Sequence, residues 1–262
     1  KAQGLEPLNL DGFLAVLKAS GRSRLHIEDL RRRLNRFLSY VKGDISHDSI
    51  LEFFISLNCS PKTRLHYYRA VKQFLSFYGL EDLMKGMKPP RLLKKEAPLV
   101  SLEDVVEDLN RMDLGMKRSA LLLIYTGLRP WEAQRLKWSD FELENAKIFV
   151  RAEIAKDRED RFTFFPRNFT MELEELKNMK LKPLEISSFQ HKMRKIGCRL
   201  TPKMFRKFFI QRVELLGVPR GVVKRLIGHR ASDIYEAHYF SISWSEVEKF
   251  YRSIENKILP SL

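Results

Sequence analysis

Four short stretches between residues 126 and 240 carry side chains that could together bind an anion. They read TGLRPWE at 126–132, TPKMFR at 201–206, LIGH at 226–229 and IYEAHYF at 234–240. Lys203 and Arg206 lie on one face of a predicted helix, where two cations repel each other unless an anion lies between them. Taken singly, each stretch also has a structural interpretation: a surface arginine, a solvated helix face, a capping histidine or a core tyrosine.

The charge of the whole chain also favours an anionic partner. The 262 residues include 48 Lys and Arg against 33 Asp and Glu, a formal net charge of +15. Residues 1–96 carry a net charge of +8 and the remaining residues +7, so both halves could contact phosphates, as a clamp would. A chain this basic usually binds nucleic acid, although solubility alone is an alternative explanation.

The composition limits the expected cofactors and location. Cys59 and Cys198 lie far apart and lack metal-ligand spacing, so we predict two reduced structural thiols in a cytoplasmic protein that works beside the DNA of the cell. No carboxylate cluster suited to magnesium is evident, and we expect neither a metal nor another cofactor. The longest apolar stretch, at 120–128, is too short to span a membrane.

The first of two predicted domains, residues 1–86, is a helical bundle. Apolar residues recur at helical spacing in four segments, at 25–42, 48–57, 60–79 and 81–85. Basic residues occupy the outer faces of these helices, which indicates either a DNA-binding surface or merely solvated charges. The candidate contacts with DNA are Lys62, Arg64 and Arg69.

A basic segment with three prolines, residues 87–100, is predicted to be the linker to the second domain. Its prolines disfavour a helix and stiffen the connection, so it could lie along a phosphate backbone. Further candidate contacts with DNA are Arg91, Lys94 and Lys95.

The second predicted domain, residues 101–262, combines helices with one small sheet. Helical patterns occupy 101–112, 116–126 and the region from 170 onward. Between them, β-branched and aromatic residues in 147–166 flank the charged turn AKDRED, which predicts a β-hairpin. The predicted fold class is therefore mainly α with a small antiparallel β-sheet.

Two of these motifs resemble the tyrosine recombinases, the phage integrase-like family. That family has an arginine in a T-G-L-R-x-x-E context, which residues 126–132 match through Arg129 and Glu132. It also has a lysine in the turn of a β-hairpin, which Lys156 matches. The resemblance implies an N-terminal core-binding domain followed by an α+β catalytic domain.

The remaining motifs follow in the order that the family shows. Its His-x-x-Arg pair opens a helix, and here the pair is Lys203 and Arg206, similar to the Lys-x-x-Arg variant of archaeal virus and plasmid integrases. Its Leu-Gly-His segment is matched by 227–229, with isoleucine in place of leucine. Tyr239 then matches the family's tyrosine. The implied catalytic residues are Arg129, Lys156, Lys203, Arg206, His229 and Tyr239.

The resemblance implies a site-specific recombinase, or integrase, that cleaves and rejoins double-stranded DNA through a 3′-phosphotyrosine. Arg129 and Arg206 would hold the phosphate oxygens, and His229 would donate a hydrogen bond to the same phosphate. Lys156 would protonate the departing 5′-oxygen, and Glu132 would orient neighbouring basic side chains. Lys203 is a departure from histidine that favours charge stabilisation over proton transfer.

Several alternatives stay open at this point. Tyr235 is a second candidate nucleophile, four residues before Tyr239. A type IB topoisomerase, a catalytically inactive DNA-binding protein or a helical RNA-binding protein would also be basic. The C-terminal helix that begins near Trp244 could pack on its own domain or dock on a neighbouring protomer. Docking on a neighbour would imply a homotetramer on two DNA sites, with a monomer possible without DNA.

Overall fold

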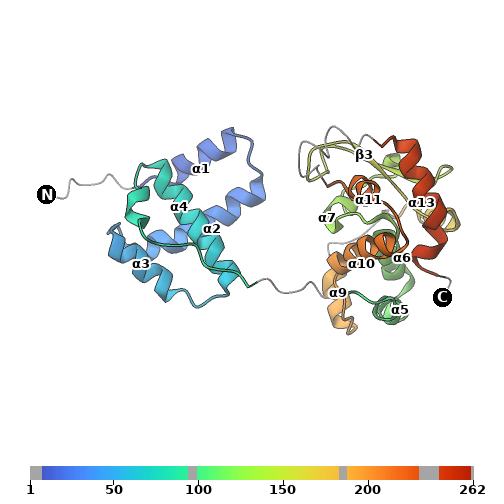
Figure 1. Ribbon diagram of the computed structural model, residues 1–262, viewed down its shortest axis with the longest axis horizontal. Helices are drawn as coiled ribbons and strands as arrows, with labels where there is room; N and C mark the ends of the chain where they lie inside the picture. The colour runs from blue at the N-terminus through green and yellow to red at the C-terminus, as the bar shows by residue number, and fades with distance from the viewer. Residues whose placement is uncertain (1–7, 94–98, 183–187, 230–241, 261–262) are drawn as a thin grey trace. The chain divides into compact units, whose positions relative to one another are not determined.

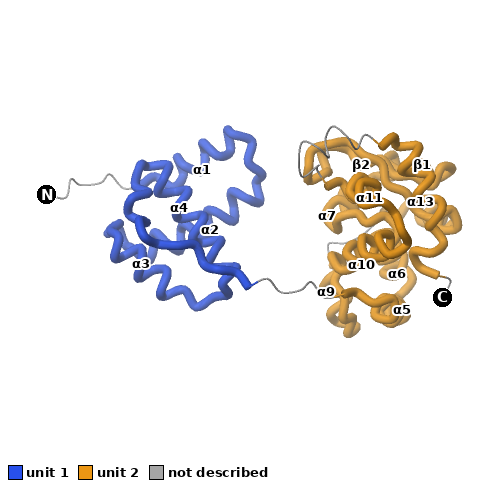
Figure 2. Tube along the Cα trace, viewed as in Figure 1, with its two compact units in different colours: residues 1–96 blue, residues 97–262 orange. Residues whose placement is uncertain are grey.

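A computed structural model describes residues 8–93, 99–182, 188–229 and 242–260. The chain forms two compact units, residues 1–96 and 97–262, each with its own hydrophobic core (Figure 2). The prediction of a mainly α fold with a small antiparallel sheet is confirmed (Figure 1). The predictions for Lys94, Lys95, Tyr235 and Tyr239 lie outside the described residues.

The first unit is a bundle of helices around an aromatic core. Its elements are α1 (Leu10–Ala19), α2 (Arg24–Val41), α3 (His47–Ser56), α4 (Pro61–Phe77) and the 3₁₀ turn η1 (Glu81–Met84). Serine side chains accept hydrogen bonds from backbone N–H groups at the starts of α2, α3 and α4, as N-caps do. Phe53 lies at the centre, with its ring edge-on to those of Phe37, Tyr40 and Tyr67.

The second unit places helices around a three-stranded sheet. Its helices are α5 (Leu102–Arg111), α6 (Leu114–Thr126), α7 (Pro130–Ala133), α8 (Thr170–Asn178), α9 (Phe189–Lys195), α10 (Pro202–Leu215), α11 (Arg220–Ile227) and α13 (Trp244–Ile258). Two 3₁₀ turns, η2 (Trp138–Asp140) and η3 (Arg167–Phe169), flank the sheet in sequence. Among the described helices, none is long and apolar enough to cross a membrane.

The sheet contains the predicted hairpin. Its strands β1 (Phe141–Glu142), β2 (Lys147–Val150) and β3 (Arg161–Phe164) are antiparallel in the order β1-β2-β3. Ile148 pairs with Thr163 and Val150 with Arg161, so the connection from 151 to 160 carries Lys156. The Thr163 hydroxyl donates to the carbonyl of Thr126 at 2.8 Å, which ties the hairpin to the end of α6.

Helix α6 is the centre of the second core and packs against α10. It ends at Gly127, which has φ +60, a left-handed conformation that glycine adopts without strain. A Cβ atom at Gly127 would overlap the ring of Phe209 on α10. The close approach of these two helices therefore requires glycine at this position.

We expect Gly127→Ala to lower the free energy of unfolding by about 3 kcal/mol. The left-handed backbone contributes about 1–2 kcal/mol of this loss and the clash with Phe209 the rest. Gly217→Ala is the control, because Gly217 has φ +83 and nothing within 4 Å of its added Cβ. Urea unfolding of both variants measures the difference, and equal losses would contradict the packing argument.

Helix α13 packs on its own unit within the single chain. Val247, Tyr251 and Ile258 are fully buried, and the Tyr251 hydroxyl donates to the carbonyl of Tyr125 at 3.0 Å. Arg252 donates to the carbonyls of Phe165 and Asn145, beside the sheet, at 3.0 and 2.7 Å. The apolar face of this helix is thus covered by residues of the same chain.

Candidate active site

The turn between α6 and α7 positions Arg129. Leu128 is buried beside the terminal glycine of α6, and Pro130 occupies the first position of α7, where its missing N–H is not needed. The backbone N–H of Arg129 donates to Oε2 of Glu132 at 3.1 Å, so the glutamate caps this short helix. Two aspects of the T-G-L-R-x-x-E motif, its glycine and its glutamate, thus place the arginine.

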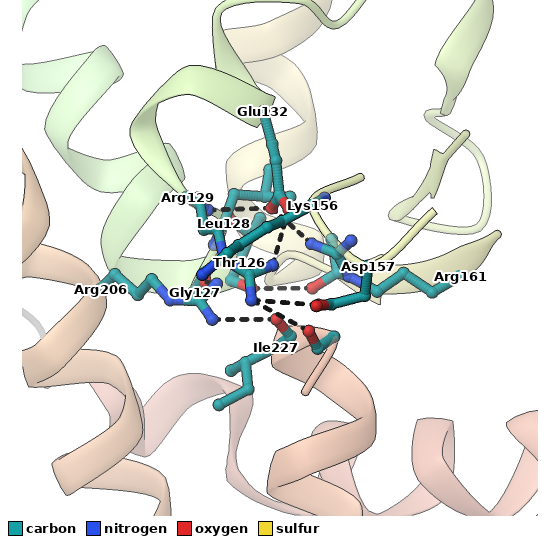
Figure 3. Close-up of polar contacts among 12 residues, drawn as sticks. Thr126, Gly127, Leu128, Arg129, Glu132, Lys156, Asp157, Arg161, Arg206 and Ile227 are labelled. Carbon is teal, nitrogen blue, oxygen red and sulfur yellow. Dashed lines mark hydrogen bonds and ion pairs between the residues drawn. The ribbon is translucent and has the colours of Figure 1, made fainter. Parts of the chain in front are cut away.

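The Arg129 guanidinium makes contacts with three different segments (Figure 3). Nη1 donates to Oε1 of Glu132 at 2.8 Å, and Nη2 donates to Asp157 Oδ2 at 3.2 Å and to the carbonyl of Gly228 at 3.1 Å. Only 13% of the side chain is exposed. These contacts join α7, the hairpin turn and the end of α11 at one arginine.

Arg206 reaches the same place from α10. Thr201 and Pro202 begin this helix, and Arg206 lies one turn inside it, 8% exposed. Its Nη1 donates to the carbonyl of Gly127 at 2.5 Å and its Nη2 to that of Ile227 at 3.0 Å. Burial and the nearby charge of Arg129 lower the pKa of Arg206 to about 10, so it keeps its charge at neutral pH.

Glu132 is the buried carboxylate that balances these cations. Its two oxygens accept from Arg129, from the Arg161 guanidinium at 2.6 Å and from the backbone N–H of Lys156 at 3.3 Å. Burial alone would raise the pKa of Glu132, but the adjacent Arg161 and Arg129 lower it below its ordinary value. We call these four residues, Arg129, Glu132, Lys156 and Arg161, the Glu132 cluster.

We expect Glu132→Gln to lower the free energy of unfolding at pH 7 by about 3–5 kcal/mol, because it leaves buried guanidiniums without their carboxylate. A lowered folded pKa stabilises the fold above the ordinary carboxyl value and loses that contribution as the pH falls through the folded value. The difference between wild type and variant should therefore shrink below about pH 4.5. Denaturant unfolding at pH 7 and at pH 3.5 measures it.

Glu174→Gln is the control for that prediction, since Glu174 is an exposed carboxylate on α8. We expect it to change the free energy of unfolding by less than about 0.5 kcal/mol at either pH. Equal stabilities of wild type and Glu132→Gln at pH 7 would contradict the proposed charge balance.

Lys156 lies in the turn of the hairpin with its side chain exposed. Its backbone is tied to Glu132, and its neighbour Asp157 is paired with Arg129, so the turn is held over the arginines. The backbone of the turn is thus anchored, whereas the side chain of Lys156 is exposed.

His229 and Lys203 stand at the ends of helices. Helix α11 ends at Gly228, which has φ +61, and the backbone N–H of His229 then donates to the carbonyl of Lys224 at 2.9 Å. Partial burial and the charges of Arg206 and Arg129 lower the pKa of His229, so the ring is neutral at neutral pH. Lys203 is exposed in the first turn of α10, three residues before Arg206.

Sequence reasoning missed two members of this site, Asp157 and Arg161. Asp157 follows Lys156 directly in the charged turn, and this adjacency is the sequence feature that could have identified it. Arg161 opens β3 and shares a sheet face with Thr163, and both are buried although they are polar. Because both faces of this strand are buried, alternation of apolar and polar residues does not identify a buried arginine in it.

The candidate DNA contacts of the first unit differ in their surroundings. Lys62 and Arg69 are exposed on α4, and Arg91 is exposed after η1. Arg64 is only partly exposed, and its Nη2 donates to the carbonyl of Leu57 at 2.8 Å. Arg64 therefore holds the loop between α3 and α4, a role that the sequence pattern did not indicate.

The described part of the site is a cluster of cations that includes the buried Arg206 and the part-buried Arg129. It can hold the oxygens of an anion such as a phosphodiester and stabilise charge that develops on them. Within the described ranges, no group of three or more His, Cys, Asp or Glu side chains is placed to hold a metal ion.

Comparisons with known proteins give the chain its family. The sequence model of the archaeal phage integrase family matches residues 99–256. Tyrosine recombinase XerA of Thermococcus kodakarensis is 24% identical over 245 residues, covering 84% of this chain and 86% of that protein. The same recombinase of Thermococcus onnurineus is 26% identical over 252 residues, covering 86% and 88%.

The fold is similar to that of a lambda integrase tetramer solved on a Holliday junction. The TM-score is 0.66 at 12% identity, over 86% of this chain and 77% of the other. At this identity, the likeness concerns the fold alone. Since the family match spans more than half of the chain, this protein belongs to the archaeal phage integrase family and is a tyrosine recombinase.

Proposed function

We propose that this recombinase cleaves and rejoins double-stranded DNA with Tyr239 as its nucleophile. The observation that carries the proposal is the pair of guanidiniums of the part-buried Arg129 and the buried Arg206, fixed by carbonyls of residues 127, 227 and 228. A guanidinium is a planar cation with several N–H donors, which suits the non-bridging oxygens of a phosphodiester.

In the first step the Tyr239 oxygen attacks phosphorus, and the bond from phosphorus to the 5′-oxygen breaks. The phosphate becomes a 3′-phosphotyrosine and a 5′-hydroxyl is released, so no bond energy is lost to water. Arg129 and Arg206 stabilise the negative charge of the transition state, and Lys203 adds a further cation beside them. Rejoining reverses the step, with a 5′-hydroxyl attacking the phosphotyrosine.

Proton transfer is assigned to Lys156 and His229. The exposed ammonium of Lys156, in the anchored hairpin turn, donates a proton to the departing 5′-oxygen. The imidazole of His229 is neutral at neutral pH, so one nitrogen can accept the phenolic proton while the other donates to the phosphate. The two transfers balance and reverse when the strands are rejoined.

In this proposal, the first unit and the linker bind the DNA backbone. Lys62, Arg69 and Arg91 are exposed cations suited to phosphate contacts, with Lys94 and Lys95 following in the linker. Such contacts position the protein without reading bases. We further propose a homotetramer on two DNA sites, supported by the likeness of the fold to a lambda integrase tetramer on a Holliday junction.

The test is covalent trapping. Wild-type protein is incubated in EDTA with a duplex of its target region that carries a nick next to the cleavage point, so the short strand diffuses away after cleavage. A denaturant-stable adduct, removed by protease, is the expected result. DNA binding that depends steeply on salt, without any adduct, would overturn the enzymatic proposal. If the adduct forms, an assay of strand exchange between two labelled duplexes separates a recombinase from a topoisomerase.

A further inference from the structure

Arg161 is a buried cation that the proposed chemistry does not use. It opens β3, is 5% exposed, and its Nη2 lies 2.6 Å from Oε2 of the fully buried Glu132 (Figure 3). It does not compete for Glu132 with Arg129, whose Nη1 is bound by the other oxygen, Oε1. One carboxylate therefore carries two guanidiniums in fixed and different directions.

A second contact of Arg161 is with the turn that ends α11. A Cβ atom added to Gly228 would lie 2.8 Å from Nε and 2.9 Å from Cζ of Arg161. The glycine backbone therefore lies directly on the guanidinium, and the carbonyl of this same Gly228 accepts from Arg129. Arg161 thus lies against both of the residues that accept from Arg129 here, Glu132 and Gly228.

This arrangement gives the fold little stability. Nε of Arg161 is buried and has no hydrogen-bond partner in the part of the chain that the structure describes. An unpaired buried donor is destabilising, and a buried ion pair often stabilises a fold no better than apolar side chains of the same volume. Stability alone therefore gives little reason for an arginine here.

We propose that Arg161 is a positioning residue, which keeps the Lys156 turn in register with Arg129 by holding the carboxylate of Glu132. The backbone N–H of Lys156 is 3.3 Å from Oε1 of Glu132, a long and weak bond that depends on the orientation of the carboxylate. Without Arg161, Glu132 can rotate and the turn with the lysine that supplies the proton is displaced, while the carbonyl of Gly228 still holds Arg129. This inference rests on the roles proposed above for those two residues.

The test compares cleavage of two substrates by Arg161→Met, Arg161→Lys and the wild type. One substrate is the normal nicked duplex; in the other, sulfur replaces the 5′-bridging oxygen at the cleavage point. A thiolate leaves without being protonated, so this substrate does not need the lysine. Arg151→Met is the matched control, because Arg151 pairs with the buried Asp140 at 2.8 Å from the same hairpin.

We expect Arg161→Met to slow single-turnover cleavage of the normal duplex about a hundredfold at saturating DNA. On the sulfur substrate most of this deficit disappears, as it does for Lys156→Ala. Arg161→Lys, which keeps the charge but not the planar fork, should show the same selective rescue. Arg151→Met should cleave both substrates at wild-type rates.

Arg161→Lys keeps a positive charge beside Glu132 and so keeps the experiment interpretable if Arg161→Met unfolds. It should fold, bind DNA as wild type does and show the selective defect on the normal substrate. Wild-type rates for a folded Arg161 variant, or a defect equal on both substrates while Lys156→Ala is rescued, would overturn the positioning role. Absence of any adduct with the wild type would instead overturn the proposed function itself.

Discussion

Tyr239→Phe is expected to form no covalent adduct with DNA, whereas Tyr235→Phe should form it at close to the wild-type rate. The change removes one oxygen, and without that oxygen no phosphotyrosine can exist. The two residues are four positions apart, and both lie outside the described residues, so chemistry must separate them. Covalent trapping on the nicked duplex, followed by mass spectrometry of the DNA-linked peptide, identifies the tyrosine.

Binding measured in parallel makes the result decisive. Both variants should bind the duplex with the wild-type affinity and salt dependence, because phosphate contacts by lysine and arginine dominate that affinity. An adduct that persists in Tyr239→Phe and disappears in Tyr235→Phe would reassign the nucleophile.

Arg206→Lys is expected to slow cleavage by about a hundredfold or more, even though the positive charge is kept. A single donor removed from the charge developing in a transition state typically costs 10²–10³ in rate. The Arg206 guanidinium is fixed through two backbone carbonyls, and an ammonium cannot reproduce that planar fork. Single-turnover adduct formation at saturating DNA measures the effect without interference from binding.

Arg199→Lys is the control for charge-conserving replacement. Arg199 precedes the same helix but is 62% exposed and pairs with Asp104 and Glu107 at the surface. Its replacement should leave the cleavage rate unchanged, since exposed ion pairs contribute little. A wild-type rate for Arg206→Lys would mean that Arg206 acts by charge alone, and an equal loss at both positions would mean that the loss is not specific to Arg206.

Local signals were sufficient for most of the elements that carry the site. The β-hairpin around Lys156 was predicted because its strands contrast with the helical periods on either side, and Ser60 with Pro61 predicted the start of α4. Helix α1 was not predicted, although Asn9 caps it by accepting from the N–H of Gly12. The helix is only ten residues long, so its amphipathic pattern is a weak signal.

The polar contacts within the site could not be predicted in the same way. Glu132 and Arg161 are 29 residues apart, and their pairing depends on how the hairpin packs against α6 and α7. Arg64 is a second example. The sequence pattern predicts a surface residue that contacts DNA, but its guanidinium donates to the carbonyl of Leu57 in the preceding loop. Spacing in the sequence predicts which residues are neighbours within one helix or strand. Contacts between different helices and strands can be identified only from the folded structure.

The glycines that end α6 and α11 have an electrostatic consequence for the free enzyme. The carbonyls that accept from Arg129 and Arg206 belong to the carboxyl ends of these two helices. The aligned peptide dipoles of a helix place about half a negative charge at that end. Two helix ends thus supply about one negative charge to the arginine pair, and because this charge resides in the backbone, substitution of side chains does not remove it. Arg129 and Arg206 can therefore be held together before any phosphate arrives.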